Sequence, residues 1–235
     1  MNLITALIIT GVFFYLTANL LKKYTKTFYI GFYLVILGML LINSSGYYQK
    51  LDPVLKFYVD LFQRGVISTA IFIIVMYLGV FTKHNDITKR FYRIRGEMSI
   101  IACLMALTHN ILYGVRYFVN FFKNPELMPL QVKVASIISI MLITLMVPLF
   151  ITSFKCVRKK MRAKNWKRLQ RFSYLFYMLI YIHVMVLFSM DVEKNKFSIV
   201  VYTLVYVTYL VLRLRKYALS GMREEKRIIK AKEPA

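Results

Sequence analysis

The sequence predicts an all-α, polytopic membrane bundle of about seven transmembrane helices. Its composition gives the first reason: 59% of the 235 residues are hydrophobic and the mean hydropathy is +0.56, whereas a soluble domain is about 45–50% apolar. The second reason is that seven apolar runs approach or reach the ~20 residues that a helix needs to cross the hydrocarbon core. They lie near 3–21, 28–45, 60–82, 97–122, 132–154, 170–190 and 197–214.

Each run is justified by its length and its surroundings. The run 3–21 lacks a preceding basic region and a small-residue cleavage site, so we expect a retained membrane helix rather than a signal peptide. The runs 28–45 and 197–214 are somewhat short, and the other four are long enough to span. No internal repeat, Gly/Ser linker or low-complexity segment interrupts them.

Basic residues alternate between the two sides of the predicted bundle. The segments 22–27, 83–96 and 155–171 hold three, five and nine Lys/Arg residues, and the end of the chain from Arg213 holds eight, out of 33 in all. The positive-inside rule therefore predicts that these segments are cytoplasmic, with the N-terminus outside and the C-terminus inside. An odd number of helices fits, and we expect a multi-pass protein of the plasma or inner membrane.

The formal charge of +23 follows from this topology. Cationic loops beside a membrane attract anionic lipid, so membrane lipid is an expected partner and nucleic acid is not. The two cysteines, Cys103 and Cys156, fall in an apolar run and in a basic loop, which predicts no disulfide.

Two of the three histidines lie inside predicted spans. His109 is about 12 residues into the fourth span and His183 about 13 residues into the sixth, each counted from the cytoplasmic end. At 1.5 Å of rise per residue both imidazoles lie roughly 18–20 Å above that boundary. Two imidazoles at one depth are suited to axial ligation of one haem iron. Interhelical hydrogen bonding explains them equally well. His84 is interpreted as a solvated loop residue.

Other residues near these positions have two interpretations each. Arg64 and Arg116, at the outer ends of their spans, would pair with haem propionates or serve as interface anchors that reach outward. Tyr113 and the aromatic residues around His183 would line a porphyrin or simply pack between helices.

The segment 151–188 (ITSFKCVRKKMRAKNWKRLQRFSYLFYMLIYIHVMVLF) resembles the ferric-reductase-like transmembrane family. The closest likeness is to the haem-binding membrane subunits of bacterial methionine-sulfoxide reductase systems. Those subunits have Thr-Ser at a helix end, a basic loop, a Trp-x-x-Leu-His segment and a second histidine 13 residues later. Thr152-Ser153, Trp166, Leu169 and His183 match this pattern.

Upstream, the segment 90–113 (RFYRIRGEMSIIACLMALTHNILY) is similar to the family's Arg-rich loop and first ligand helix. His109 takes the ligand position there and Tyr113 follows it. The likeness covers roughly 28–215, which we expect to be a six-helix haem-binding membrane domain. Residues 1–27 are then an additional helix with a short basic loop, and 216–235 a basic cytoplasmic tail.

The chain departs from the family pattern at Gln170, which stands where the first histidine of the 13-residue pair is expected. Arg95 and Gly96 stand 13–14 residues before His109, so the fourth helix offers no second ligand either. The resemblance therefore implies one b-type haem, held by His109 and His183.

The resemblance implies electron transfer across the membrane, in an oxidoreductase system rather than a self-contained enzyme. No G-x-G-x-x-G motif occurs, so the donor is expected to be a separate cytoplasmic flavin reductase or quinone. The acceptor would be a periplasmic or extracellular redox partner, a flavoprotein or ferric iron. Flavin mononucleotide (FMN) is a further implied cofactor, to which no residue is assigned.

A non-redox membrane protein, such as a sensor, an assembly factor or a transporter, is the alternative. A proton-coupled transporter normally needs carboxylates in mid-membrane, and here Asp60 and Glu97 stand only at the ends of predicted spans. Neither a Ser/His/Asp nor a His-Glu-x-x-His arrangement of a hydrolase is evident.

Overall fold

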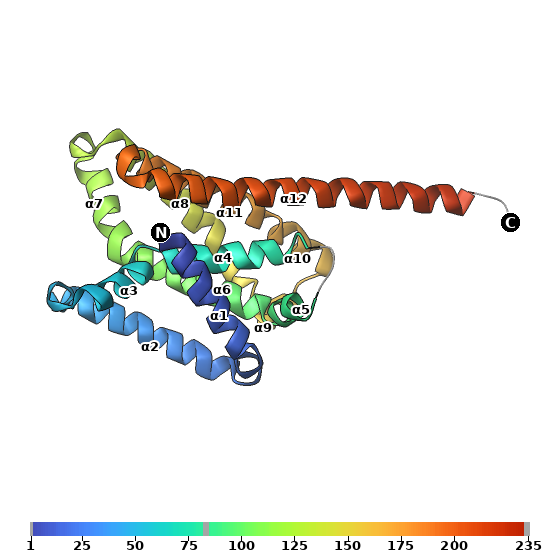
Figure 1. Ribbon diagram of the computed structural model, residues 1–235, viewed down its shortest axis with the longest axis horizontal. Helices are drawn as coiled ribbons and strands as arrows, with labels where there is room; N and C mark the ends of the chain where they lie inside the picture. The colour runs from blue at the N-terminus through green and yellow to red at the C-terminus, as the bar shows by residue number, and fades with distance from the viewer. Residues whose placement is uncertain (1, 82–84, 233–235) are drawn as a thin grey trace.

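The computed structural model describes residues 2–81 and 85–232 and contains only helices and their connections within those ranges (Figure 1). The longer helices bear out the all-α prediction. They are α1 (Asn2–Lys23), α2 (Thr25–Ser44), α3 (Pro53–Gln63), α4 (Val66–Leu78), α5 (Asp86–Arg93), α6 (Arg95–His109), α7 (Val115–Lys123), α8 (Leu130–Ile151), α10 (Ala163–Gln170), α11 (Phe172–Phe188) and α12 (Val192–Lys232). Short turns η1 (Tyr47–Lys50), η2 (Asn110–Gly114) and η3 (Pro125–Leu127) and the six-residue α9 (Lys155–Lys160) connect them. His84 lies outside the described residues.

Six helical segments of the described chain are long and apolar enough to cross a membrane, and a bent pair would make a seventh. This is a polytopic helical membrane bundle, as predicted. The third predicted span, 60–82, is wrong in detail, because the structure begins it at Pro53 and breaks it into α3 and α4 with a bend of 54°. Hydropathy detects apolar composition but not a change of direction.

The bend is located at Gly65, between α3 and α4. Gly65 has a φ of 73°, in the left-handed region that glycine enters without a Cβ clash. Asp52 begins α3 by accepting hydrogen bonds from the backbone N–H groups of Val54 and Leu55. At the end of α3, backbone N–H groups of the bend donate to the carbonyls of Asp60 and Phe62. The Gln63 carbonyl has no partner further along its own helix, so it is an acceptor for another part of the chain.

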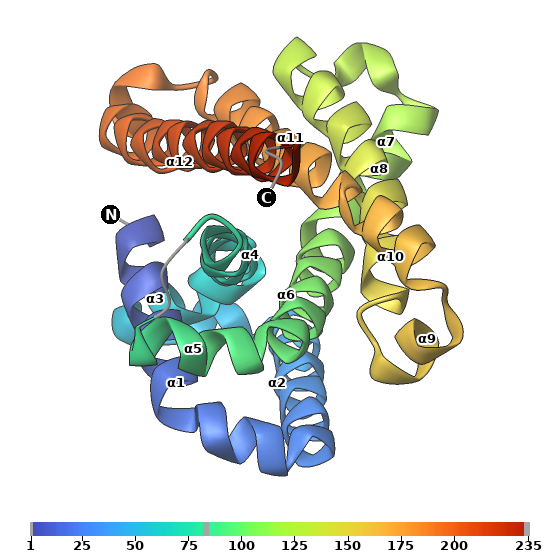
Figure 2. The same ribbon diagram turned by 90° about the vertical axis from the view of Figure 1, so that its right-hand side faces the viewer.

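Helix α4 is the most buried helix of the bundle and packs mainly between α1 and α6. Figure 2 shows α4 end-on between these neighbours. A second tight pairing joins α8 and α11, and α12 packs along α11. Helix α1 buries Leu3, Phe14 and Leu21 in the same hydrophobic core as α4. The additional N-terminal helix is thus part of the packed bundle, whereas the predicted domain boundaries stay a prediction.

Helix α12 is the longest element, with 41 residues. It continues without a break from the predicted span 197–214 through most of the predicted tail. Figure 1 shows it passing well beyond the rest of the molecule toward the C-terminus.

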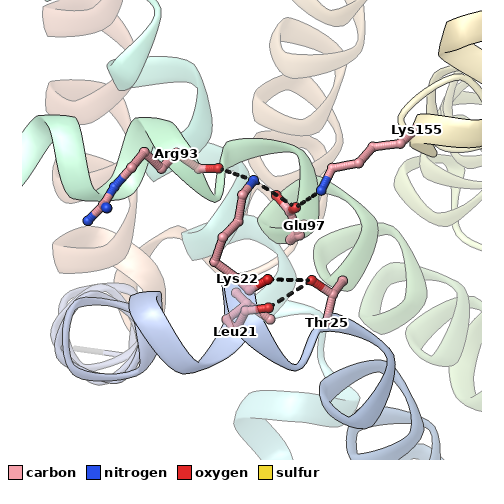
Figure 3. A network of polar contacts seen from close by, with 6 residues as sticks. All are labelled: Leu21, Lys22, Thr25, Arg93, Glu97 and Lys155. Atoms are coloured by element: carbon pink, nitrogen blue, oxygen red, sulfur yellow. Dashed lines mark hydrogen bonds and ion pairs between the residues drawn. The ribbon is translucent and has the colours of Figure 1, made fainter.

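Three of the four basic segments meet at one end of the bundle around a single carboxylate (Figure 3). The Glu97 side chain is only 4% exposed, and its Oε1 lies 3.2 Å from Lys22 Nζ and 3.0 Å from Lys155 Nζ. Lys22 also donates a hydrogen bond of 2.8 Å to the backbone carbonyl of Arg93. The network therefore joins the end of α1, the start of α6 and the start of α9.

We expect Glu97→Gln to destabilise the protein by about 1–3 kcal/mol, because a buried carboxylate then no longer compensates two ammonium groups. Thermal unfolding in detergent, followed by circular dichroism, measures the change. Glu193→Gln is the matched control, since Glu193 forms an exposed pair with Lys196 one turn along α12, and such pairs contribute at most about 1 kcal/mol. Equal shifts for the two variants would contradict this account of Glu97.

Candidate functional site

His109 is the last residue of α6, and its ring is fixed by the end of another helix. Its Nδ1 lies 2.8 Å from the backbone carbonyl oxygen of Gln63, in the last turn of α3. A carbonyl can only accept a hydrogen bond, so Nδ1 carries the hydrogen and donates it. In the neutral imidazole this leaves Nε2 with its lone pair, which is the state of a metal ligand.

His183 has the same arrangement on a different pair of helices. It lies on α11, and its Nδ1 is 3.2 Å from the backbone carbonyl of Ala135 on α8. Ser139, one turn further along α8, places its Oγ 3.4 Å from the same nitrogen. The acceptor again assigns the hydrogen to Nδ1, so Nε2 of His183 is also a free lone pair.

His109 and His183 are both partly buried, and each bonds to a backbone carbonyl of another helix. Their helices α6 and α11 are far apart in the sequence. Both helices pack against α4 and against α8. The pairing of His109 with His183 stays a prediction.

Gly65 forms the surface against which the His109 ring lies. A Cβ added at Gly65 would be 3.1 Å from Cγ and 3.3 Å from Cδ2 of His109. Only a residue without a side chain allows the α3–α4 bend to approach the ring this closely. The same bend supplies the Gln63 carbonyl, so one local feature both holds and orients His109.

The chain after His109 forms a π-helical turn, η2. Such turns insert an extra residue into a helix and occur frequently at functional sites. Tyr113 lies on this turn with its ring stacked on His109, 5.6 Å between ring centroids at 30°. The predicted aromatic neighbour of the histidine is thus in contact with it.

The two predicted arginines differ in their surroundings. Arg64 forms an ion pair of 2.9 Å with Asp60, and Tyr48 donates a hydrogen bond to the same carboxylate. That hydrogen bond, followed by desolvation and the negative charge of Asp60, raises the pKa of Tyr48. Arg116 is exposed on α7. Propionate pairing stays a prediction for both arginines.

The motif residues that carry the family resemblance also contact one another. Trp166 Nε1 donates to the carbonyl of Thr152 at 3.1 Å, and Gln170 Nε2 donates to the Thr152 hydroxyl at 3.2 Å. Gln170 is therefore fixed by a hydrogen bond between α10 and the end of α8.

Sequence reasoning missed Gln63, Gly65, Ala135 and the π-helical turn. The carbonyl acceptors are backbone atoms, so no residue type signals them. Gly65 inside an apolar run, directly after a charged residue, was the one signal available for the bend.

The two histidines fit a haem by the chemistry of their donor atoms. Each has one nitrogen held by a backbone carbonyl and the other free, which is how ligating imidazoles are usually oriented. Among the described residues no three His, Cys, Asp or Glu side chains gather as a metal-ion site. A haem needs only two axial protein ligands, which His109 and His183 can supply.

The fold and these histidines define a multi-pass membrane protein with two imidazoles that each form a hydrogen bond between helices. The description "Ferric reductase like transmembrane component" matches residues 64–181, a stretch that begins at the α3–α4 bend, contains His109 and ends two residues before His183. The chain belongs to the ferric-reductase-like transmembrane family, which indicates a membrane electron-transfer role.

The chain is also similar to an uncharacterized protein of Treponema pallidum (strain Nichols). The two are 34% identical over 200 residues, which cover 83% of this chain and 55% of the relative. The chain thus spans about half the length of that relative. No solved structure matches it.

Proposed function

We propose that this protein is a membrane b-type cytochrome that binds one haem through His109 and His183. The observation that carries the proposal is the shared state of the two imidazoles, each with Nδ1–H donated to a backbone carbonyl and Nε2 free. A haem with two imidazole ligands supplies a one-electron couple without an open iron position, which favours electron transfer over oxygen chemistry.

The protein's own residues supply position and surroundings. The Gln63 and Ala135 carbonyls fix the tautomer and the orientation of the two imidazoles and increase their basicity. Gly65 and Tyr113 enclose the His109 ring from the α3–α4 bend and from the π-helical turn. The surrounding apolar helices keep water from the histidines and so favour a low local dielectric.

We propose that electrons pass from a cytoplasmic donor to an acceptor at the outer face of the membrane. The basic end of the bundle, around Glu97, is cytoplasmic in this proposal, with the N-terminus outside and the C-terminus inside. A flavoprotein or a quinone donates electrons, with FMN as a further cofactor. A reductase partner, a flavoprotein or ferric iron accepts them. The likeness to methionine-sulfoxide reductase membrane subunits supports a protein partner as acceptor.

The absorption spectrum of the purified protein tests the proposal. Protein from haem-replete cells is expected to show a Soret band that shifts on reduction with dithionite, with about one haem per chain by the pyridine haemochrome assay. A colourless preparation that is folded by circular dichroism would reject it.

A non-redox role is the second candidate, and one observation favours it. Each histidine already bonds to a different helix, His109 to α3 and His183 to α8, as interhelical hydrogen-bonding residues do. This role uses only one nitrogen of each ring. It predicts that alanine at either position lowers stability and leaves the spectrum of the preparation unchanged.

A further inference from the structure

A cavity of about 350 Å³ lies near the basic end of the bundle, apart from both histidines. Its walls come from α4, α6, α8, α10, α11 and α12. Gln170, the residue that departs from the family pattern, is part of the wall, as are Arg95 and Ser99 on α6. A volume of this size is in the range of sites for small molecules.

Among the residues that the structure describes, three cationic side chains and no carboxylate line the cavity. They are Arg95, Lys167 and Arg171. Like charges around one cavity repel each other, and this repulsion is relieved when an anion binds among them. The Gln170 amide donates one of its two N–H hydrogens to Thr152, so the other can be donated to a phosphate oxygen.

The wall changes from polar to apolar along α10 and α11. Lys167 and Arg171 are exposed, whereas Phe176 and Tyr177 in the next turns are buried. A ligand that follows this wall has an anionic group at one end and an apolar body at the other. The gradient therefore indicates an amphiphile rather than a free inorganic ion.

The buried end of the wall contains a hydroxyl group without a partner. Tyr177 is fully buried, and among the described residues its hydroxyl makes no hydrogen bond. A buried polar group in this state costs roughly 1–3 kcal/mol. The hydroxyl oxygen has almost no accessible surface, so Tyr177 contributes its apolar ring to this end of the cavity.

We propose that this cavity binds a phosphate-bearing amphiphile, with its phosphate among Arg95, Lys167 and Arg171 and its apolar body beside Tyr177. The phosphate can come from an anionic membrane lipid or from a phosphorylated aromatic molecule such as FMN, and the second source rests on the proposed function, which includes FMN. Basic pockets between transmembrane helices bind anionic lipid headgroups on this physical basis. The site contains neither histidine, so it stands independently of haem binding.

Binding is measured on the purified full chain with two pairs of probes. One pair is FMN and riboflavin, which share the ring but differ in the phosphate, followed by quenching of flavin fluorescence. The other is phosphatidylglycerol and phosphatidylcholine in nanodiscs, followed by lipid retention in native mass spectrometry. One phosphate-bearing probe is expected to bind at least about tenfold more tightly than its neutral counterpart, and the pair that shows this identifies the source.

The matched variants remove two charges inside or outside the cavity. Lys167→Gln with Arg171→Gln is expected to weaken the preferred probe at least about tenfold. Lys159→Gln with Lys160→Gln removes the same charge from α9, outside the cavity, and is expected to leave binding within about twofold. Equal losses in both double variants, or no preference for phosphate in the unaltered protein, would overturn the proposal.

Gln170→Glu keeps the test decisive if the double variant does not fold. The new carboxylate lies among the three cations, so it is expected to raise the unfolding temperature and to weaken the phosphate-bearing probe. A variant that gains stability and binds the probe unchanged would also overturn the proposal. The Soret band is recorded in the same samples, so a failure of the cavity proposal is distinguishable from a failure of the haem proposal.

Discussion

Replacing His183 or His109 with alanine is expected to abolish the Soret band of the purified protein. Each variant removes one of two axial nitrogens, and a single imidazole on one helix no longer fixes the iron between two helices. We expect haem retention to fall by at least about 100-fold, since loss of even an outer-shell partner lowers metal affinity about 10–100-fold. The pyridine haemochrome assay on protein of known concentration gives the ratio.

Two controls separate ligand loss from misfolding. His84→Ala removes the third histidine, which is expected to leave the spectrum unchanged. His183→Gly with added imidazole is expected to regain a Soret band, because the free base can occupy the space of the missing ring. A His183→Ala preparation that keeps its full haem content would contradict the assignment of this ligand.

Substituting Gly65 with alanine is the second change with a large expected effect. The new Cβ would lie 3.1 Å from Cγ of His109, so the ring must move. A non-glycine residue at φ 73° adds backbone strain of roughly 1–2 kcal/mol. We expect haem affinity to fall about tenfold, as for other groups that orient a ligand, and the low-spin signal in electron paramagnetic resonance to shift with the ring orientation.

Gly38→Ala on α2 is the matched control for this substitution, because nothing lies within 4 Å of the Cβ that it adds. It is expected to leave haem content and the resonance spectrum unchanged. If both glycine variants behave alike, Gly65 has no particular role in positioning His109. The comparison therefore separates a local steric effect from a general effect of alanine in membrane helices.

Much of this architecture can be predicted from the sequence, because a membrane-spanning helix requires a long run of apolar residues. Apolar runs of about 20 residues predict α1, α2 and α8 closely, since only a helix satisfies its backbone polar groups within lipid. The sequence also shows two histidines inside apolar runs, where ionisable residues are rare, and their pairing stays a prediction. The resemblance to the ferric-reductase-like family then favours haem ligation as the role of His109 and His183.

The remaining features depend on atoms that residue types do not show. The Gln63 and Ala135 carbonyls are backbone acceptors, and only the packed fold reveals that they face the two imidazoles. The bend at Gly65 lies within an apolar run whose composition is equally compatible with a straight helix. Glu97 was expected at a span end, but its burial between two lysines required the approach of α1 and α9.

The length of α12 has a geometric consequence at the C-terminal end. A continuous helix of 41 residues is about 60 Å long at 1.5 Å per residue, about twice the ~30 Å of the hydrocarbon core. If α12 crosses the membrane once, roughly 30 Å of the helix therefore extends beyond the hydrocarbon core. A continuous helix is stiffer than a flexible tail, so it would hold a partner bound near its end at a fixed distance from the bilayer.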